Sequence, residues 1–359
     1  MAVSCGIIGR PSVGKTELFT LLTGKNTSGS DIETGVAKVP DHRLDRLEEI
    51  YQPKKTSYAL VDIVDIPGQY LVSGGDASKH EREFLDTVRN VDALVHVVRA
   101  FSNDAVWHVD GSINPVRDLN TVNTDLILFD LDLTETRLER IEQARNKGVK
   151  GSEAEFEVLK KCRDILEAEK PLSTGDFSEK ELESLQNLQF LTFKPLIIAV
   201  NLDESQLLSG DYPGKEDVYA WAADRGIPVF EINVEMEKEI NELEAAEQEE
   251  FFKEMGIKER GVAKLARAVY GCMGLISFLT VGKDEVRAWT IKEGTRAKEA
   301  AGKVHSDIER GFIRAEVIAY EDFIACGSEK AAKEKNLYRL EGKDYVVKDG
   351  DIINFRFNV

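Results

Sequence analysis

A glycine-rich loop near the amino terminus carries the residue types that hold a nucleoside triphosphate. Its eight residues follow the pattern G-x-x-x-x-G-K-[ST], and they are Gly9, Arg10, Pro11, Ser12, Val13, Gly14, Lys15 and Thr16. Glycines let the backbone wrap around phosphates with its N–H groups pointing inward. A lysine at this place reaches the β- and γ-phosphates, and the next hydroxyl can bind Mg²⁺. The loop predicts a nucleotide site in which Lys15 also serves catalysis.

The flanks of the loop have the pattern that phosphate binding requires. Residues 3–8 form an apolar run typical of a buried strand, and residues 16–22 open a helix that ends near Gly24. A strand, a loop and a helix amino terminus bring N–H groups and the helix dipole to one point. The sequence therefore predicts that the chain binds a nucleotide.

A second motif, Asp65-Ile66-Pro67-Gly68, ends the next apolar run. In P-loop switches an aspartate at this place belongs to the Mg²⁺ shell, and the glycine N–H contacts the γ-phosphate. The motif is common in isolation, but here it follows the glycine-rich loop by about fifty residues at the end of a predicted strand. We expect Thr16 and Asp65 to be the metal ligands and Gly68 to contact the nucleotide.

A third motif is expected to contact the base. Asn201-Leu202-Asp203-Glu204 ends another apolar run, where GTPases carry N-K-x-D. The last Asp of that motif accepts two hydrogen bonds from guanine, so Glu204 should weaken guanine selection, because an unmet group in a buried pocket costs about 1–3 kcal/mol. The pattern favours ATP and leaves GTP open. The predicted base-contacting residues are Asn201, Leu202, Glu204, Asn233 and Val234.

These motifs need parallel strands whose carboxyl ends come together. Apolar strand candidates alternate with helical patterns, which predicts a three-layer α/β domain with a parallel sheet. The candidates after the first strand are residues 58–65, 93–99, 196–201 and 228–233. Ligands of such sheets bind at the carboxyl ends of the strands, where the motifs fall.

Two further regions interrupt and follow this domain. Between residues 126 and 194, apolar residues at helical spacing, punctuated by Gly148 and Gly151, predict an inserted helical hairpin. After Gly274, short β-type runs predict a small α+β domain with strands at 276–281, 286–291, 313–318, 344–347 and 352–357. The predicted domains are therefore residues 1–125 with 195–275, residues 126–194, and residues 276–359.

Length and charge limit the classes of function. A chain of 359 residues suits two or three domains, and its net charge of −18 argues against general nucleic-acid binding. Residues 281–359 hold 15 basic and 15 acidic residues, so a contact with RNA or the ribosome would use this neutral part. No apolar run suits a bilayer, the four cysteines are scattered, and the first strand begins at once. We expect a monomeric cytoplasmic protein with reduced thiols and no membrane association.

Over nearly its whole length the chain resembles the YchF subfamily of Obg-like P-loop NTPases. The resemblance rests on Asn-x-x-Glu at residues 201–204, on the helical insertion before it, and on long matches in the C-terminal part. These matches are residues 285–291, 301–307, 309–315, 341–345 and 348–355. The resemblance implies a P-loop NTPase domain and a C-terminal TGS-type ubiquitin-like domain. It also implies slow hydrolysis with ATP preferred, and association with ribosomes or stress responses.

The chain departs from this family where the last phosphate would be sensed. Ser12 stands where the family has Asn, whose carbonyl helps to bind potassium in relatives, so the sequence does not predict potassium activation. Asp31 occupies the place of a Mg²⁺-sensing Thr, with Thr27 and Thr34 as alternatives. A carboxylate at that place could meet the metal, but it would repel the γ-phosphate.

Two more residues are candidates for catalysis. Gln69 follows the D-x-x-G motif and can orient the attacking water, or it is a surface residue. His108 matches a family histidine that the resemblance connects with hydrolysis, although a lone histidine is more often structural. His96, within an apolar strand, is expected to be a satisfied core residue. Two alternatives stay open: a nucleotide-binding scaffold with negligible hydrolysis, and a GTP-preferring switch.

Overall fold

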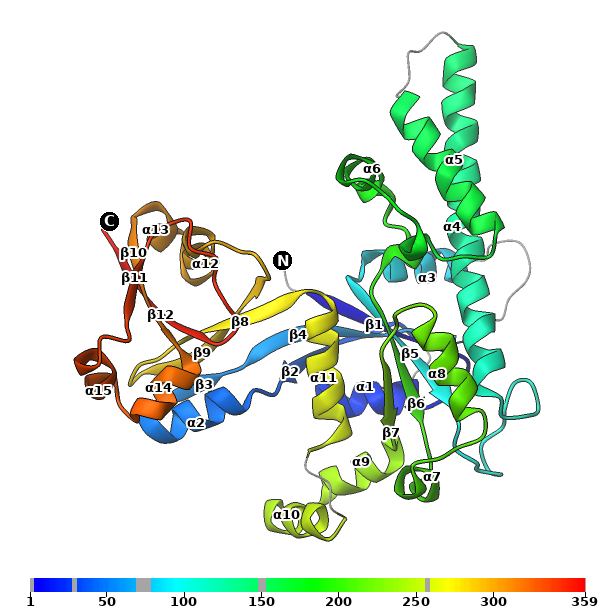
Figure 1. The fold of residues 1–359 in the computed structure, drawn as a ribbon. Helices are drawn as coiled ribbons and strands as arrows, with labels where there is room; N and C mark the ends of the chain where they lie inside the picture. The colour runs from blue at the N-terminus through cyan, green and yellow to red at the C-terminus, as the bar shows by residue number, and fades with distance from the viewer. Residues whose placement is uncertain (1–2, 28–30, 69–78, 148–152, 256–258, 359) are drawn as a thin grey trace. The chain divides into compact units, whose positions relative to one another are not determined.

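The computed structural model describes residues 3–27, 31–68, 79–147, 153–255 and 259–358 (Figure 1). The chain divides into two compact units. The nucleotide-loop unit holds Val3–Gly35 and Asp62–Leu265, and the C-terminal unit holds Val36–Val61 and Ala266–Val359. The two units divide the chain differently from the three domains, because residues 36–61 group with the C-terminal residues. The three-domain division stays a prediction.

The first sheet carries the glycine-rich loop. Its strand order is β2-β4-β1-β5-β6-β7. The strands are β1 (Ser4–Ile8), β2 (Glu33–Val39), β4 (Ala59–Asp65), β5 (Ala93–Arg99), β6 (Leu196–Asn201) and β7 (Val229–Ile232). β1 pairs in parallel with β4 and β5, and β6 pairs in parallel with β5 and β7. The parallel sheet predicted from the sequence is confirmed, and the carboxyl ends of these strands lie at one end of it.

Both faces of this sheet are covered. Every residue of β5 is buried, as are five consecutive residues of β6. Neighbouring residues of a strand point to opposite faces, so burial at consecutive positions means packing on both sides. On one face Ile8 and Leu94 pack with Leu126 of helix α4 (Pro115–Asn146). Helix α1 (Lys15–Thr23) buries Leu18 and Phe19 and contacts β1.

The other helices of this part of the chain follow the strands in order. They are α3 (Lys79–Asn90), α5 (Glu153–Glu167), α6 (Glu179–Leu185), α7 (Glu204–Ser209), α8 (Lys215–Ala223), α9 (Val234–Glu242), α10 (Ala245–Glu254) and α11 (Gly261–Cys272). Short 3-10 turns lie at Leu172–Thr174, Gln186–Leu188 and Leu191–Phe193. In the part of the chain that the structure describes, no helix is both long and apolar enough to cross a membrane.

Helices α4 and α5 form the predicted helical hairpin and run side by side (Figure 1), with Ile141 packed near Phe156. However, α4 begins at Pro115, before residue 126 where the sequence placed the start of the insertion. Asn114 caps the helix by accepting the N–H of Arg117, and a proline at the first position has no N–H to leave unpaired. A single helix of 32 residues therefore joins the core of the unit to the insertion.

The C-terminal unit is built on a mixed sheet with the strand order β11-β10-β12-β8-β9-β3. Its strands are β3 (Lys55–Ser57), β8 (Leu275–Thr280), β9 (Glu285–Lys292), β10 (Phe312–Ala319), β11 (Arg339–Glu341) and β12 (Asp351–Phe357). The pairs β12–β8 and β9–β3 are parallel, and the others are antiparallel. Its helices are α2 (His42–Tyr51), α12 (Ala297–Val304), α13 (Ser306–Arg310), α14 (Tyr320–Cys326) and α15 (Glu329–Glu334). The predicted α+β fold is confirmed.

Several strand predictions need correction. Residues 344–347 form no strand, and Val346 makes only an isolated bridge with Arg296. The sequence did not predict β2, β3 or β11, because β2 is half-exposed along most of its length and the other two are three residues long. Such segments have too few buried positions to show a period. Gly148 and Gly151, expected between the hairpin helices, lie outside the described residues.

Candidate nucleotide-binding site

The glycine-rich loop is confined by its neighbours at its glycines. Gly14 caps α1 with a φ of 98°, and a Cβ there would lie 2.5 Å from Asn201 Nδ2. A Cβ on Gly68 would lie 2.6 Å from Lys15 Nζ and 2.7 Å from the carbonyl oxygen of Gly9. Since the cap has no side chain, the N–H groups of the first turn of α1 face a space where the helix dipole favours an anion.

Lys15 lies buried within the loop. Its Nζ donates to the carbonyl oxygens of Gly9 at 3.0 Å and Arg10 at 2.7 Å. Burial lowers the pKa of Lys15 to about 8, and the charges of Asp65 and Glu17 act in the opposite direction. A triphosphate would stabilise the charged ammonium and offer it stronger acceptors than carbonyls. The lysine is therefore placed to exchange loop carbonyls for phosphate oxygens.

Thr16 and Asp65 meet at the carboxyl end of β4. Thr16 Oγ1 donates to Asp65 Oδ2 at 2.8 Å. The other carboxylate oxygen, Oδ1, is buried and has no hydrogen-bond partner among the described residues. Burial raises the pKa of Asp65, while the Thr16 hydrogen bond and the Lys15 charge lower it. A buried acceptor without a donor, next to a hydroxyl, suits a hard cation with oxygen ligands, so these residues fit Mg²⁺.

Asn201 joins the loop to the segment after β7. Its Nδ2 donates to the carbonyl oxygen of Val13 at 3.0 Å, and its Oδ1 accepts the N–H of Val234 at 3.1 Å. Asn233 caps α9 by accepting the N–H of Met236. The structure brings these residues together beside the loop, and they act there by holding its backbone.

Leu202 and Glu204 have contrasting surroundings. Leu202 is buried in a cluster with Tyr212 and Trp221. Glu204 is exposed at the first position of α7, whose cap is Asp203. The Leu202 side chain is thus part of the core, and Glu204 is the one of the pair whose carboxylate is open to a ligand.

His108 is buried, and both of its ring nitrogens have partners. Nε2 lies 3.2 Å from Asp118 Oδ2, and Nδ1 accepts the N–H of Asp110 at 3.2 Å. The Asp110 carboxylate accepts from Arg10 Nη2 with distances of 3.1 and 3.0 Å. Sequence reasoning did not identify Asp110 or Asp118. The one available signal was the Asn114-Pro115 helix start, which places Asp118 in the first turn of α4 near the loop.

The remaining candidates lie at the rim of the loop or outside the described residues. Ser12 is exposed with a left-handed φ of 59°. Asp31 is exposed, and Thr34 is exposed within β2, where its carbonyl oxygen accepts from Lys25 Nζ at 3.1 Å. Gln69 lies outside the described residues.

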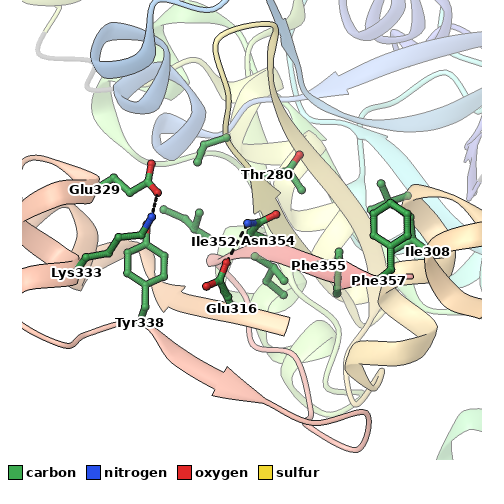
Figure 2. A pocket seen from close by; sticks show the side chains of 13 residues that line it. Thr280, Ile308, Glu316, Glu329, Lys333, Tyr338, Ile352, Asn354, Phe355 and Phe357 are labelled. Atoms are coloured by element: carbon green, nitrogen blue, oxygen red, sulfur yellow. Dashed lines mark hydrogen bonds and ion pairs between the residues drawn. The ribbon is translucent and has the colours of Figure 1, made fainter. Parts of the chain in front are cut away.

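A second cavity, of about 370 Å³, lies within the C-terminal unit. Figure 2 shows the ion pair of Lys333 and Glu329 at one end of it and Ile308 with Phe357 at the other. Asn354 Nδ2 donates to the carboxylate of Glu316 at 3.0 Å. None of the residues that line this cavity belongs to the candidate nucleotide site.

Comparisons with known proteins are consistent across the chain. Residues 4–147 match the family model described as "50S ribosome-binding GTPase", and residues 275–358 match the YchF-type GTPase C-terminal model, described as "Protein of unknown function". The chain is 42% identical over 372 aligned residues to the "Ribosome-binding ATPase YchF" of Bacillus subtilis (strain 168). It is 42% identical over 369 residues to the protein of that name from Escherichia coli O157:H7, and both alignments cover both chains completely. The solved structure of the Schizosaccharomyces pombe YchF GTPase matches with a TM-score of 0.85 and 31% identity, over 99% of this chain and 97% of that one.

Proposed function

The chain belongs to the YchF family of P-loop NTPases, and from this premise we propose that it is a Mg²⁺-dependent nucleoside triphosphatase that works as a slow switch and prefers ATP to GTP. The observation that carries the proposal is the assembled phosphate end of the site, with Lys15 inside the loop and Thr16 bonded to Asp65. Phosphoryl transfer is catalysed mainly by positioning and by stabilisation of charge, and these groups suit both tasks.

Each side chain has a stated role in this proposal. Lys15 binds the β- and γ-phosphates together with the N–H groups of the loop. Thr16 and Asp65 hold Mg²⁺, which when bound neutralises charge on those phosphates. Gln69 and His108 are the candidates that orient or activate the attacking water.

Single-turnover hydrolysis of ATP by the full chain tests the enzyme proposal. We expect slow cleavage in Mg²⁺ and none in EDTA, and a rate lowered about tenfold or more by Gln69→Ala or His108→Ala. A wild-type protein that binds ATP and never cleaves it would instead support a nucleotide-binding scaffold. The departures from the family pattern at Ser12 and Asp31 favour that second candidate.

The preference for ATP rests on Glu204 and on the names of the relatives. A glutamate at the end of the base motif is longer than the aspartate that reads guanine, and the two bacterial relatives are named ATPases. The amino-terminal family model and the yeast structure are named GTPases, so a GTP-preferring switch is the alternative. Calorimetric titration with each nucleotide in Mg²⁺ decides between them, and tighter binding of GTP would reject our proposal.

We also propose the ribosome as the partner, because both bacterial relatives are named ribosome-binding. The C-terminal unit offers basic residues to RNA phosphates: Arg314 on β10 and Arg356 on β12 are cross-strand neighbours, and both are exposed. Deleting residues 276–359 would also remove the partner strand of β3, so a substitution is the cleaner test. We expect Arg314→Glu to reduce co-sedimentation with ribosomes. Lys298→Glu, on the exposed side of α12, is the matched control, and equal binding by both variants and the wild type would reject this surface.

A further inference from the structure

The segment between β5 and α4, residues 100–114, is fastened at both of its ends. At its start Arg99, the last residue of β5, donates to the carbonyl oxygens of Phe101, Asn103 and Val106 at 3.2, 3.1 and 3.0 Å. Its guanidinium also lies 4.3 Å from the centre of the Phe101 ring. This first half is thus held by the rigid strand, and it is independent of the glycine-rich loop.

The second half is fastened to the glycine-rich loop itself. Arg10 is 7% exposed and contacts both carboxylate oxygens of Asp110 through Nη2. Its Nε is buried and has no hydrogen-bond partner among the described residues. On the other side, Arg117 of α4 lies 3.6 Å from Asp110 and donates to Asp118 at 2.9 Å. Asp110 is therefore shared between the glycine-rich loop and the first turn of α4.

His108 is held at the centre of this cluster. Because Nδ1 accepts the N–H of Asp110, Nε2 carries the proton and donates to Asp118. A neutral imidazole in this arrangement has no free lone pair, so it cannot accept a proton from water. The adjacent Trp107 is 68% exposed, so the segment turns sharply from solvent to core between these two residues.

We propose that residues 100–114 form a latch, closed here by the Arg10–Asp110 and His108–Asp118 contacts, and that triphosphate binding at Lys15 opens it. The link is the backbone of Arg10: its carbonyl oxygen accepts from Lys15 Nζ, and its side chain holds Asp110. When phosphate oxygens take the Lys15 N–H groups, Arg10 loses that tie, and its unused Nε–H favours a move toward the new negative charge. The hold on Asp110 weakens, and His108 leaves Asp118 with its ring nitrogens free. This inference rests on the proposed role of His108 in hydrolysis, and Asp110 and Asp118 are positioning residues in it.

Hydrogen–deuterium exchange of the full chain, with and without AMP-PNP and Mg²⁺, tests the latch independently of turnover. In the wild type we expect nucleotide to protect the peptide of residues 9–16 and to raise exchange in residues 106–111. In Asp110→Asn, exchange of residues 106–111 should be high already and respond little to nucleotide. Glu153→Gln is the matched control, because it removes a carboxylate held by Arg145 at 2.8 Å on the hairpin and should behave as the wild type. Protection of both peptides in the wild type, or no change in Asp110→Asn, would overturn the latch.

Single-turnover hydrolysis separates the latch from a merely structural role of the cluster. Asp110→Asn should raise the rate by about threefold or more, since a larger fraction of the protein has the latch open. The gain should vanish in the double variant with His108→Ala. If Asp110→Asn slows hydrolysis as His108→Ala does, Asp110 orients His108 for the reaction and the latch is wrong. If no variant hydrolyses ATP while nucleotide still raises exchange of residues 106–111, the latch stands and the enzymatic function fails.

Discussion

The phosphate end and the base end of the nucleotide site are built in different ways. At the phosphate end, Lys15 and Asp65 are buried, and Lys15 bonds to backbone carbonyls while Asp65 bonds to Thr16. At the base end, Leu202 belongs to the hydrophobic core, and Glu204 is exposed at the start of a six-residue helix. One end is held by the fold, and the other depends on a side chain at the surface.

This difference separates two kinds of recognition. Phosphates are bound by backbone geometry and buried charge, so changes there should alter the binding of every nucleoside triphosphate and also the stability of the protein. A base is selected by hydrogen bonds from a few side chains, so changes there should shift only the ratio between nucleotides. The following substitutions test this comparison.

Lys15→Met should have the largest effect. It removes the charged hydrogen bonds to phosphate and should weaken ATP and GTP binding alike, by about 3 kcal/mol, or roughly a hundredfold. Without nucleotide the variant should be more stable than the wild type, because a buried ammonium costs free energy. Calorimetry measures the first effect and urea unfolding the second.

The exposed Lys25, which pairs with Glu33, provides the control for Lys15. Lys25→Met should change neither nucleotide affinity nor stability by more than a few tenths of a kcal/mol, roughly the worth of a surface ion pair. A loss of affinity for only one of the two nucleotides in Lys15→Met would break the comparison.

His96 extends the cost of the phosphate end into the sheet behind it. It pairs in register with Ile8, and its Nε2 is buried without a hydrogen-bond partner among the described residues. The expectation of a core residue is confirmed, and the expectation of a satisfied one is wrong. Burial, with a contribution from the charge of Lys15, lowers the pKa of His96 from 6.5 to about 3.

This shift predicts a loss of stability in acid. The folded pKa lies below the unfolded one, so between pH 3 and 6.5 the unfolded chain binds more protons and stability falls as the pH falls. At about pH 5 the wild type should have lost about 2 kcal/mol more than His96→Phe, relative to neutral pH, in urea unfolding. Val95→Ala, which leaves a core cavity, should lower stability equally at both pH values. Parallel pH profiles of wild type and His96→Phe would refute the assignment.

Glu204→Asp should have a smaller effect, confined to the base. The shorter carboxylate restores the group that accepts hydrogen bonds from guanine, so GTP binding should tighten by about 1 kcal/mol, or roughly fivefold, with ATP binding unchanged. Glu235→Asp, at an exposed position in the first turn of α9, is the matched control. A parallel change for ATP and GTP would show that Glu204 acts on the phosphates or on the fold, and the contrast between the two ends would fail.

The sequence predicted those features that depend on local patterns. The bounds of β5 and β6, Ala93–Arg99 and Leu196–Asn201, agree with the predicted strands, because each strand is a continuous apolar run buried on both faces. The glycine-rich loop was recognisable because phosphate binding by backbone needs glycines at fixed places.

Features that depend on distant contacts could not be predicted. Arg10 and Asp110 are 100 residues apart and meet only because β1 and β5 are neighbours in the sheet. The burial of Leu202 among residues of α8 likewise depends on tertiary packing. For the start of α4, the signal was present in Asn114-Pro115, but hydrophobic spacing alone detects only the part of the helix that packs inside the insertion.

Ser12 should give the smallest effect and the finest test of the phosphate end. Its φ of 59° lies in the left-handed region, which asparagine adopts more readily than serine. Ser12→Asn should therefore raise the free energy of unfolding by about 0.5 kcal/mol, and Ser12→Val should lower it by about 1–2 kcal/mol. Gln52, with a φ of 43° at the end of α2, is the matched position outside the site, and Gln52→Asn should stabilise by a similar amount. Both asparagine variants should be more stable in urea, but only Ser12→Asn should change the affinity for ATP. If it does not, the conformation of the loop at this residue serves the fold alone, and phosphate recognition begins at Gly14.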